Sequence, residues 1–97
     1  REKNGIALSS RNYLLTREEK IVAANVYKYL LLNKKKLINK KISIKNIKNT
    51  ITKFGVNKIE YIKIFDINKL TKPYKKDKKN KIFIAYFLGS TRLIDNI

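Results

Sequence analysis

The stretch Lys81-Ile82-Phe83-Ile84-Ala85-Tyr86-Phe87-Leu88 decides the fold of this 97-residue chain, because it is the most apolar strand signal in it. β-Branched and aromatic residues favour strands. Side chains alternate between the two faces of a strand, so Ile82, Ile84, Tyr86 and Leu88 would share one face. Phe83, Ala85 and Phe87 would lie on the other. The sequence therefore predicts a strand over residues 81–88.

Further strands are predicted on both sides of this stretch. Gly89-Ser90-Thr91 predicts a turn into a short last strand over residues 92–96. Residues 58–65 alternate and contain Ile, Tyr and Phe, which indicates a strand with one buried face. The three strands would form an antiparallel sheet, which is stable when helices cover one of its faces.

The residues between the first two strands predict irregular structure. Residues 66–70 indicate a turn or a single helical turn. Residues 72–80 indicate a basic loop, since Pro73 blocks regular pairing and lysines crowd around it.

Two helices are predicted ahead of the strands. Thr16-Arg17-Glu18-Glu19 has the pattern of a capping box, with Thr16 as N-cap and Glu19 reaching back to its amide. This helix would run to about Leu32 and end at Asn33-Lys34-Lys35-Lys36, and its buried face would carry Val22, Val26, Tyr29 and Leu30. A second helix would start at Ser43 and stop at Gly55, with Ile44, Ile47, Ile51 and Phe54 at helical spacing.

These elements predict an α+β fold, in which a three-stranded antiparallel sheet has helices packed on one face. A chain of 97 residues suffices for one small domain, and 43% hydrophobic residues can fill a modest core. The sequence contains neither cysteine nor histidine, which excludes a disulfide framework, a Cys-based metal site and a histidine general base. No apolar run approaches the roughly 20 residues that cross a bilayer.

The net charge of +17 is the largest departure from an average composition. Such an excess can indicate a polyanionic partner. However, only four of the 24 basic residues are Arg and 20 are Lys, and they accompany abundant Ile and Asn. That combination is typical of an AT-biased genome at permissive surface positions. Proteins that read nucleic-acid sequence rely on Arg for bidentate contacts with bases.

The segment Gly5-Ile6-Ala7-Leu8-Ser9-Ser10-Arg11-Asn12 has the chemistry of an anion-binding loop. Two hydroxyls, a guanidinium and an amide follow an apolar run and precede the helix start at Thr16. The Arg fork matches the two-oxygen edge of a phosphate or carboxylate. On chemistry alone, a solvated turn that contains an Arg explains the same residues.

Three blocks of the chain resemble the pantothenate synthetase (pantoate–β-alanine ligase) family. Arg1-Glu2 followed by residues 5–12 resembles its phosphate-loop signature, and residues 59–66 resemble its first long C-domain strand. Leu88-Gly89-Ser90-Thr91-Arg92-Leu93-Ile94-Asp95-Asn96-Ile97 resembles its closing motif. The blocks cover the whole chain in the family's order, but they correspond only to the C-terminal part of the enzyme.

The resemblance implies a role for each residue of the loop. Leu8 would lie with its backbone along the adenine side of bound ATP. Ser9 and Ser10 would supply short hydrogen bonds to the phosphates, and Arg11 a fixed positive charge that stabilises them. This would be the family's version of the KMSKS-type loop of the nucleotidyl transferases.

The resemblance further implies an ATP-dependent ligase that makes pantothenate from pantoate and β-alanine through a pantoyl adenylate. The partner of this C-terminal lid domain (residues 1–97) would be an N-terminal Rossmann-like domain preceding Arg1, which would carry the pantoate and β-alanine contacts and any Mg²⁺ ligands. The 97 residues alone would then be inactive. The complete enzyme would be cytoplasmic and homodimeric, with no specific nucleic acid and no membrane as partner.

Some positions depart from the family's pattern or have no assigned role. Asn4 stands where the family usually has Asp, and Leu14 where it usually has Tyr, with Tyr13 beside it. Arg92 and Asp95 would point to opposite faces of the last strand, where a structural role is expected. Glu60 and Asp66 could be cast as an acid–base pair, but isolated carboxylates of this kind usually face solvent.

Two other functions remain open on the sequence. A small basic nucleic-acid-binding module could stack bases on Tyr61, Phe65, Phe83 and Phe87, as an RRM sheet does. Residues 81–88 lack the glycine and spacing of the RNP1 pattern, so these rings are predicted to belong to the core. A structural domain without ligand would leave the loop resemblance to chance.

Overall fold

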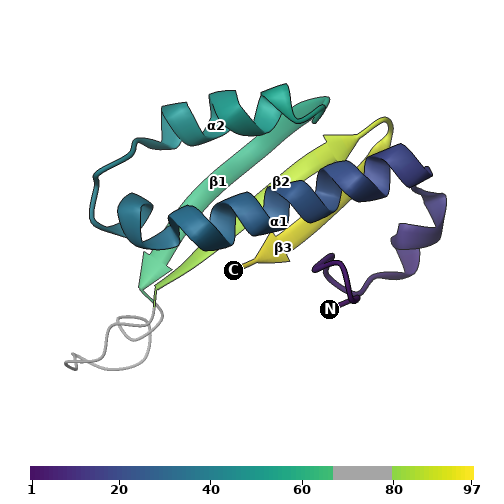
Figure 1. The fold of residues 1–97 in the computed structure, drawn as a ribbon, viewed down its shortest axis with the longest axis horizontal. Helices are drawn as coiled ribbons and strands as arrows, with labels where there is room; N and C mark the ends of the chain where they lie inside the picture. The colour runs from purple at the N-terminus through teal and green to yellow at the C-terminus, as the bar shows by residue number, and fades with distance from the viewer. Residues whose placement is uncertain (67–79) are drawn as a thin grey trace.

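The computed structural model describes residues 1–66 and 80–97 and has the predicted α+β architecture. The elements, in chain order, are the 3₁₀ helix η1 (Ser10–Leu14), the helices α1 (Arg17–Ile38) and α2 (Ile44–Lys53), and the strands β1 (Lys58–Asp66), β2 (Asn80–Leu88) and β3 (Thr91–Asn96). The strands form one antiparallel sheet in the order β1-β2-β3 (Figure 1). The turn and the basic loop predicted at residues 66–70 and 72–80 lie outside the described residues, apart from Asp66 and Asn80, which end β1 and begin β2.

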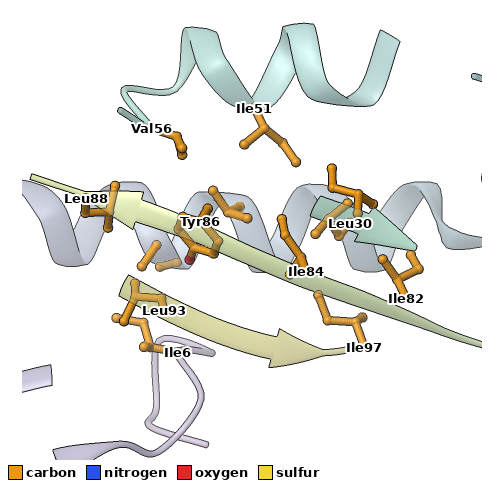
Figure 2. Packing of buried hydrophobic residues seen from close by; sticks show 14 of the residues in the cluster. Ile6, Leu30, Ile51, Val56, Ile82, Ile84, Tyr86, Leu88, Leu93 and Ile97 are labelled. Atoms are coloured by element: carbon orange, nitrogen blue, oxygen red, sulfur yellow. The ribbon is translucent and has the colours of Figure 1, made fainter. Parts of the chain in front are cut away.

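The two helices cover one face of the sheet, as predicted. In Figure 1, α1 crosses β2 and β3 while α2 runs along β1. The alternate β2 residues Ile82, Ile84, Tyr86 and Leu88 are all buried, at 5% exposure or less. They belong to one cluster with Leu30 of α1 and Ile51 of α2 (Figure 2). The core is therefore a single apolar layer between the helix pair and the sheet.

Strand β1 contains a β-bulge that its sequence pattern did not reveal. Ile59 pairs with Tyr86 and Tyr61 with Ala85, so Glu60 is the extra residue. An extra residue shifts the alternation by one position. Ile59 therefore packs against the same core as Ile62 and Ile64, although three residues separate Ile59 from Ile62.

The start of α1 confirms the predicted capping box. The Thr16 hydroxyl accepts a hydrogen bond from the Glu19 amide at 3.0 Å, and the Glu19 carboxylate accepts one from the Thr16 amide at 2.9 Å. Val26 and Leu30 are buried, and Val22 and Tyr29 are partly buried against the core. The predicted helix face is therefore correct.

The predicted end of α1 near Leu32 is wrong, because the helix continues to Ile38. Lysine is a good helix former, and Leu37, seven residues after Leu30, adds a buried side chain to the same face. The helix ends in a Schellman motif, in which the Lys41 amide donates to the Lys36 carbonyl and the Lys40 amide to the Leu37 carbonyl. Lys40 adopts φ +59°, a position that glycine usually occupies.

Helix α2 begins and ends at the predicted signals. The Ser43 hydroxyl accepts a hydrogen bond from the Asn46 amide at 3.1 Å. Ile47 and Ile51 are fully buried, and Gly55 follows the helix with φ +115°. This helix packs against β1 and covers that side of the core.

The aromatic side chains predicted to belong to the core lie instead outside the buried cluster. Phe65 is 44% exposed, and Tyr61, Phe83 and Phe87 are half-buried. Phe65 and Phe83 pack edge to face, with ring centroids 5.4 Å apart. They occupy the sheet face that the helices leave open, because the opposite β2 residues fill the helix-covered core.

Candidate functional site

A tight backbone turn opens the N-terminal segment, residues 1–15. The Gly5 amide donates to the Glu2 carbonyl at 2.9 Å, and the Glu2 amide donates to the Ile6 carbonyl at 2.8 Å. The Asn4 side-chain oxygen accepts a hydrogen bond from the Ile6 amide at 3.1 Å. An amide oxygen therefore makes the turn contact that a carboxylate could make, so the Asn4 departure leaves this turn intact.

Gly5 allows this turn to lie directly on helix α1. Its φ is +96°, and a Cβ built on it would be 2.8 Å from Cε2 of Tyr27 and still closer to Cδ2. Any side chain at this position would meet both backbone strain and the ring. The next residue, Ile6, is buried and points toward Leu93 of β3 (Figure 2). The start of the loop is thus anchored between α1 and β3.

The second half of the N-terminal segment forms the short helix η1, Ser10–Leu14. Ser9 is its N-cap, and the Ser9 hydroxyl accepts a hydrogen bond from the Arg11 amide at 3.1 Å. The Asn12 amide donates to the Ser9 carbonyl at 3.2 Å, and the Leu15 amide to the Asn12 carbonyl at 3.1 Å. Serine caps a helical turn because its hydroxyl replaces the missing backbone acceptor, so local chemistry explains this element.

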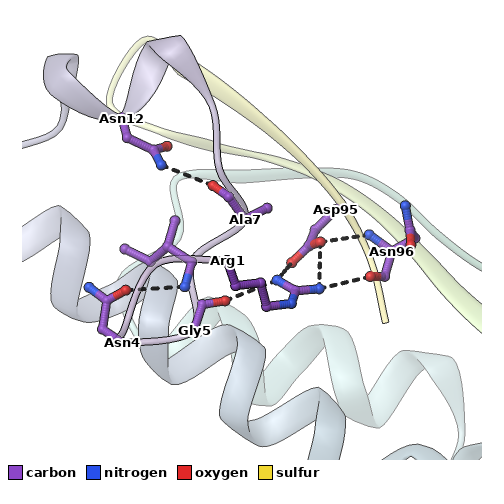
Figure 3. A network of polar contacts seen from close by, with 8 residues as sticks. Arg1, Asn4, Gly5, Ala7, Asn12, Asp95 and Asn96 are labelled. Atoms are coloured by element: carbon purple, nitrogen blue, oxygen red, sulfur yellow. Dashed lines mark hydrogen bonds and ion pairs between the residues drawn. The ribbon is translucent and has the colours of Figure 1, made fainter.

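The Asn12 side chain points into the loop and bonds its backbone, a role that was not predicted from the sequence. Its side chain is 5% exposed, and its amide nitrogen donates to the Ala7 carbonyl at 2.9 Å and to the Glu2 carboxylate at 2.6 Å (Figure 3 shows the Ala7 contact). Asn12 therefore holds the two ends of the 7–12 segment together rather than presenting its amide to solvent.

The four predicted site residues lie together on the outside of this loop. Leu8 is 73% exposed, and Ser9, Ser10 and Arg11 are exposed as well. Leu8, Ser9 and Arg11 line a cavity of about 300 Å³ between the loop and β3, together with Arg92, Asp95 and Tyr86 among others. The Arg11 guanidinium is 3.5 Å from the Arg92 carbonyl, a long hydrogen bond. Leu14, the second position that departs from the family's pattern, is also exposed, as is its neighbour Tyr13.

Arg92 and Asp95 belong to two separate ion pairs, as side chains on opposite faces of β3 would. Arg92 Nε is 2.7 Å from the Glu60 carboxylate at the bulge of β1. Asp95 pairs with Arg1 at 2.7 Å, and this hydrogen bond raises the pKa of the Arg1 guanidinium above its ordinary value. Glu60 is therefore an ion-pair partner of Arg92, and the Asp66 side chain lies outside the described part of the structure.

The residues around the loop do not fit a metal ion. Within residues 1–66 and 80–97, no group of three or more His, Cys, Asp or Glu side chains could hold one. The carboxylates that contact this segment, Glu2 and Asp95, are engaged by Asn12 and Arg1. Nor is any helix in the described ranges long and apolar enough to span a membrane.

The fold and the loop together define a class: a small α+β domain with an exposed hydroxyl-and-guanidinium loop clamped on the edge of its sheet. The chain belongs to the pantoate-beta-alanine ligase family, since the model of that family matches residues 1–97. The family that the sequence resembles is thereby confirmed.

Curated relatives agree with this assignment. The chain is 38% identical over 98 residues to the pantothenate synthetase of Ruthia magnifica and 40% identical over 100 residues to that of Thermosipho africanus. Both alignments cover 100% of this chain, but 35% and 36% of the relatives. The chain therefore spans about a third of the length of these proteins.

A solved structure has the same fold over the whole chain. It is the pantoate-beta-alanine ligase of Francisella tularensis, complexed with beta-gamma ATP and beta-alanine. The TM-score is 0.65 and the sequence identity 27%, and the match covers 100% of this chain and 30% of that one.

Proposed function

We propose that residues 1–97 are the C-terminal lid domain of a pantothenate synthetase, with the ATP-phosphate loop near residues 5–12. Family membership and the third of the relatives' length that the chain spans support this assignment. An N-terminal Rossmann-like domain of the same enzyme is then its partner. The isolated domain is inactive, because the remaining substrate contacts belong to that partner.

The proposed reaction has two steps. The carboxylate of pantoate attacks the α-phosphorus of ATP, which gives pantoyl adenylate and releases pyrophosphate. The amine of β-alanine then attacks the acyl carbon, and pantothenate and AMP are formed. The solved relative was complexed with beta-gamma ATP and beta-alanine, which supports ATP and β-alanine as ligands of the complete enzyme.

The loop acts in the first step, where negative charge builds on the departing phosphates. Preorganised donors at that position stabilise the transition state more than the ground state. The observation that supports this role is that Ser9, Ser10 and Arg11 are exposed on a loop whose base is fixed by Gly5, Ile6 and Asn12. Arg11 is the phosphate stabiliser, the two serines donate shorter hydrogen bonds, and the Leu8 backbone lies along the adenine.

Other parts of the active site lie outside this chain in the proposal. The pantoate and β-alanine contacts and the Mg²⁺ ligands belong to the N-terminal domain. The complete enzyme is a cytoplasmic homodimer.

The test is the substitution Arg11→Ala in the complete enzyme, with ATP–pyrophosphate exchange as the readout. Loss of one charged donor to a developing charge lowers such a rate by roughly 10²- to 10³-fold. Arg11→Lys is expected to recover only part of the rate, because an ammonium cannot make the bidentate contact.

Arg17→Ala is the matched control, since it removes the same charge from an exposed residue at the start of α1. Its exchange rate should stay close to that of the unaltered enzyme. An Arg11→Ala enzyme that exchanges pyrophosphate at the normal rate would refute the phosphate role of this loop.

A further inference from the structure

The Arg1 side chain makes four hydrogen bonds at the base of the loop. Its guanidinium donates to both carboxylate oxygens of Asp95, at 2.7 and 2.9 Å, and to the carbonyls of Gly5 and Asn96, both at 2.9 Å (Figure 3). The same group lies 4.1 Å from the centre of the Tyr27 ring. Planar bidentate pairing and stacking on a ring are contacts that guanidinium makes and ammonium does not reproduce.

These contacts join three parts of the molecule that are distant in sequence. Asp95 and Asn96 end β3, Tyr27 lies in the middle of α1, and Gly5 begins the loop. The Arg92–Glu60 pair has the same 2.7 Å separation, but it connects only two strands of the sheet. The Arg1 side chain therefore bonds the base of the loop at Gly5, whereas the Arg92 side chain bonds Glu60.

Gly5 is held on two sides by this arrangement. Its carbonyl accepts from Arg1, and its Cα lies against the Tyr27 ring, where a Cβ would not fit. Asn12 fixes the other end of the loop through the Ala7 carbonyl. Between these points Leu8 to Arg11 are exposed, and the Arg11 guanidinium makes one long contact, with the Arg92 carbonyl.

We propose that Arg1 is a positioning residue, which fixes the place of the Arg11 guanidinium by locking Gly5 between β3 and α1. The inference rests on the proposed phosphate role of the loop. A donor that stabilises a developing charge must be placed to within about 0.5 Å, so a loosened base lowers the rate even when the donors themselves are unaltered.

The test uses Arg1→Lys in the complete enzyme, in the presence of Arg11 and in an Arg11→Ala background. If Arg1 acts through the loop, Arg1→Lys lowers ATP–pyrophosphate exchange by roughly tenfold when Arg11 is present, and by less than about twofold when it is absent. Asp95→Asn, which weakens the same clamp from the strand side, should show the same dependence on Arg11. Thermal unfolding of each variant reports its stability.

Glu60→Gln is the matched control, because it breaks an ion pair of equal length between side chains; the contact of Arg92 with the loop is made by its backbone carbonyl, which this substitution keeps. It should leave exchange within about twofold of normal in both backgrounds.

The outcomes separate the two proposals. Equal losses in both backgrounds would mean that Arg1 acts only on stability, and an unaltered rate would mean that the clamp does not position the donors; either result overturns the inference while the phosphate role stands. If Arg11→Ala alone leaves exchange unaltered, the phosphate role fails, and the positioning role fails with it.

Discussion

Gly5 and Asn12 define the candidate loop at the scale of single residues, although neither presents a functional group to solvent. Gly5 lies flat against Tyr27 with a positive φ, and Asn12 bonds the backbone of the loop from inside. The positions of the Ser9 and Ser10 hydroxyls and of the Arg11 guanidinium depend on how Gly5 and Asn12 hold the loop backbone. Changes at these two positions should therefore affect the loop without removing any donor.

Gly5→Ala is expected to destabilise the protein by at least about 2 kcal/mol. The strained φ costs about 1–3 kcal/mol, and displacement of the Tyr27 ring adds to it. Denaturant unfolding followed by circular dichroism measures the change.

Gly89→Ala is the comparison, because Gly89 has φ +61° and its Cβ would meet only the flexible end of Glu19. It should cost about 1–2 kcal/mol, the ordinary penalty of the left-handed region. Equal costs for the two glycines would show that close packing on Tyr27 does not matter.

Tyr86 predicts a pH dependence at the alkaline end. Burial raises the pKa of its phenol well above the ordinary value of 10.0, and the negative charge of Asp95 adds to the effect. Above pH 10 the unfolded state loses this proton and the folded state keeps it. The contribution of Tyr86 to stability is therefore fully present below pH 10 and falls as the pH rises beyond it.

Tyr86→Phe isolates this contribution, because it removes the phenol hydroxyl and leaves every other side chain unaltered. Between about pH 10 and 11, the unaltered protein should lose up to about 1.4 kcal/mol more than the variant for each pH unit. Parallel stability curves for the two proteins would contradict a raised pKa at this residue.

At the scale of elements, three caps of the same kind start the helical segments. Ser9, Thr16 and Ser43 are extended residues, and each hydroxyl accepts a hydrogen bond from a backbone amide two or three residues further on. Such signals are local, so Thr16 and Ser43 were recognised in the sequence. The end of α1 has no comparable signal, because Lys40 takes the place of glycine.

Lys40→Gly should stabilise the protein by about 0.5–1 kcal/mol. Glycine removes a left-handed penalty of about 1–2 kcal/mol and adds about 0.5–1 kcal/mol of backbone entropy to the unfolded state. A thermal scan should show a rise of a few degrees.

Lys41→Gly is the control one residue further along. Lys41 does not have a positive φ, so glycine there adds backbone entropy to the unfolded state and relieves no left-handed penalty. It should lower the melting temperature. If both variants shift it in the same direction, the left-handed conformation at Lys40 is not a source of strain.

At the scale of the whole molecule, charge dominates the behaviour toward polyanions. The net charge is +17. On the open sheet face Tyr61, Phe83 and Phe87 are half-buried, and the more exposed Phe65 packs edge to face on Phe83, so the rings do not form the flat, exposed platform that stacks bases. We therefore expect single-stranded oligonucleotides to bind by charge alone. Raising salt from about 50 to about 200 mM should weaken binding by tenfold or more.

Fluorescence anisotropy with two labelled oligonucleotides of equal length and different sequence measures this. Both should give the same linear fall of log affinity with log salt. A sequence preference that persists at high salt would support the nucleic-acid-binding alternative.

Much of the fold follows from local patterns, and the candidate loop follows from its motif. The starts of both helices, all three strands and the α+β class were predicted, and Leu8, Ser9, Ser10 and Arg11 are together on one loop. Three features were not predicted: the bulge at Glu60, the extension of α1 and the position of the aromatic rings on the open face. Each depends on which remote part of the chain packs against that position.

The sequence by itself determined the caps, the alternation of β2 and the chemistry of the loop, since each involves residues within a few positions of one another. Only the tertiary structure decided that Arg1 meets Asp95, 94 residues away, that Gly5 lies on Tyr27 and that Asn12 faces inward. The physical reason is distance along the chain: a side chain's own neighbours set its backbone, but burial and ion pairing depend on which remote segments folding brings beside it.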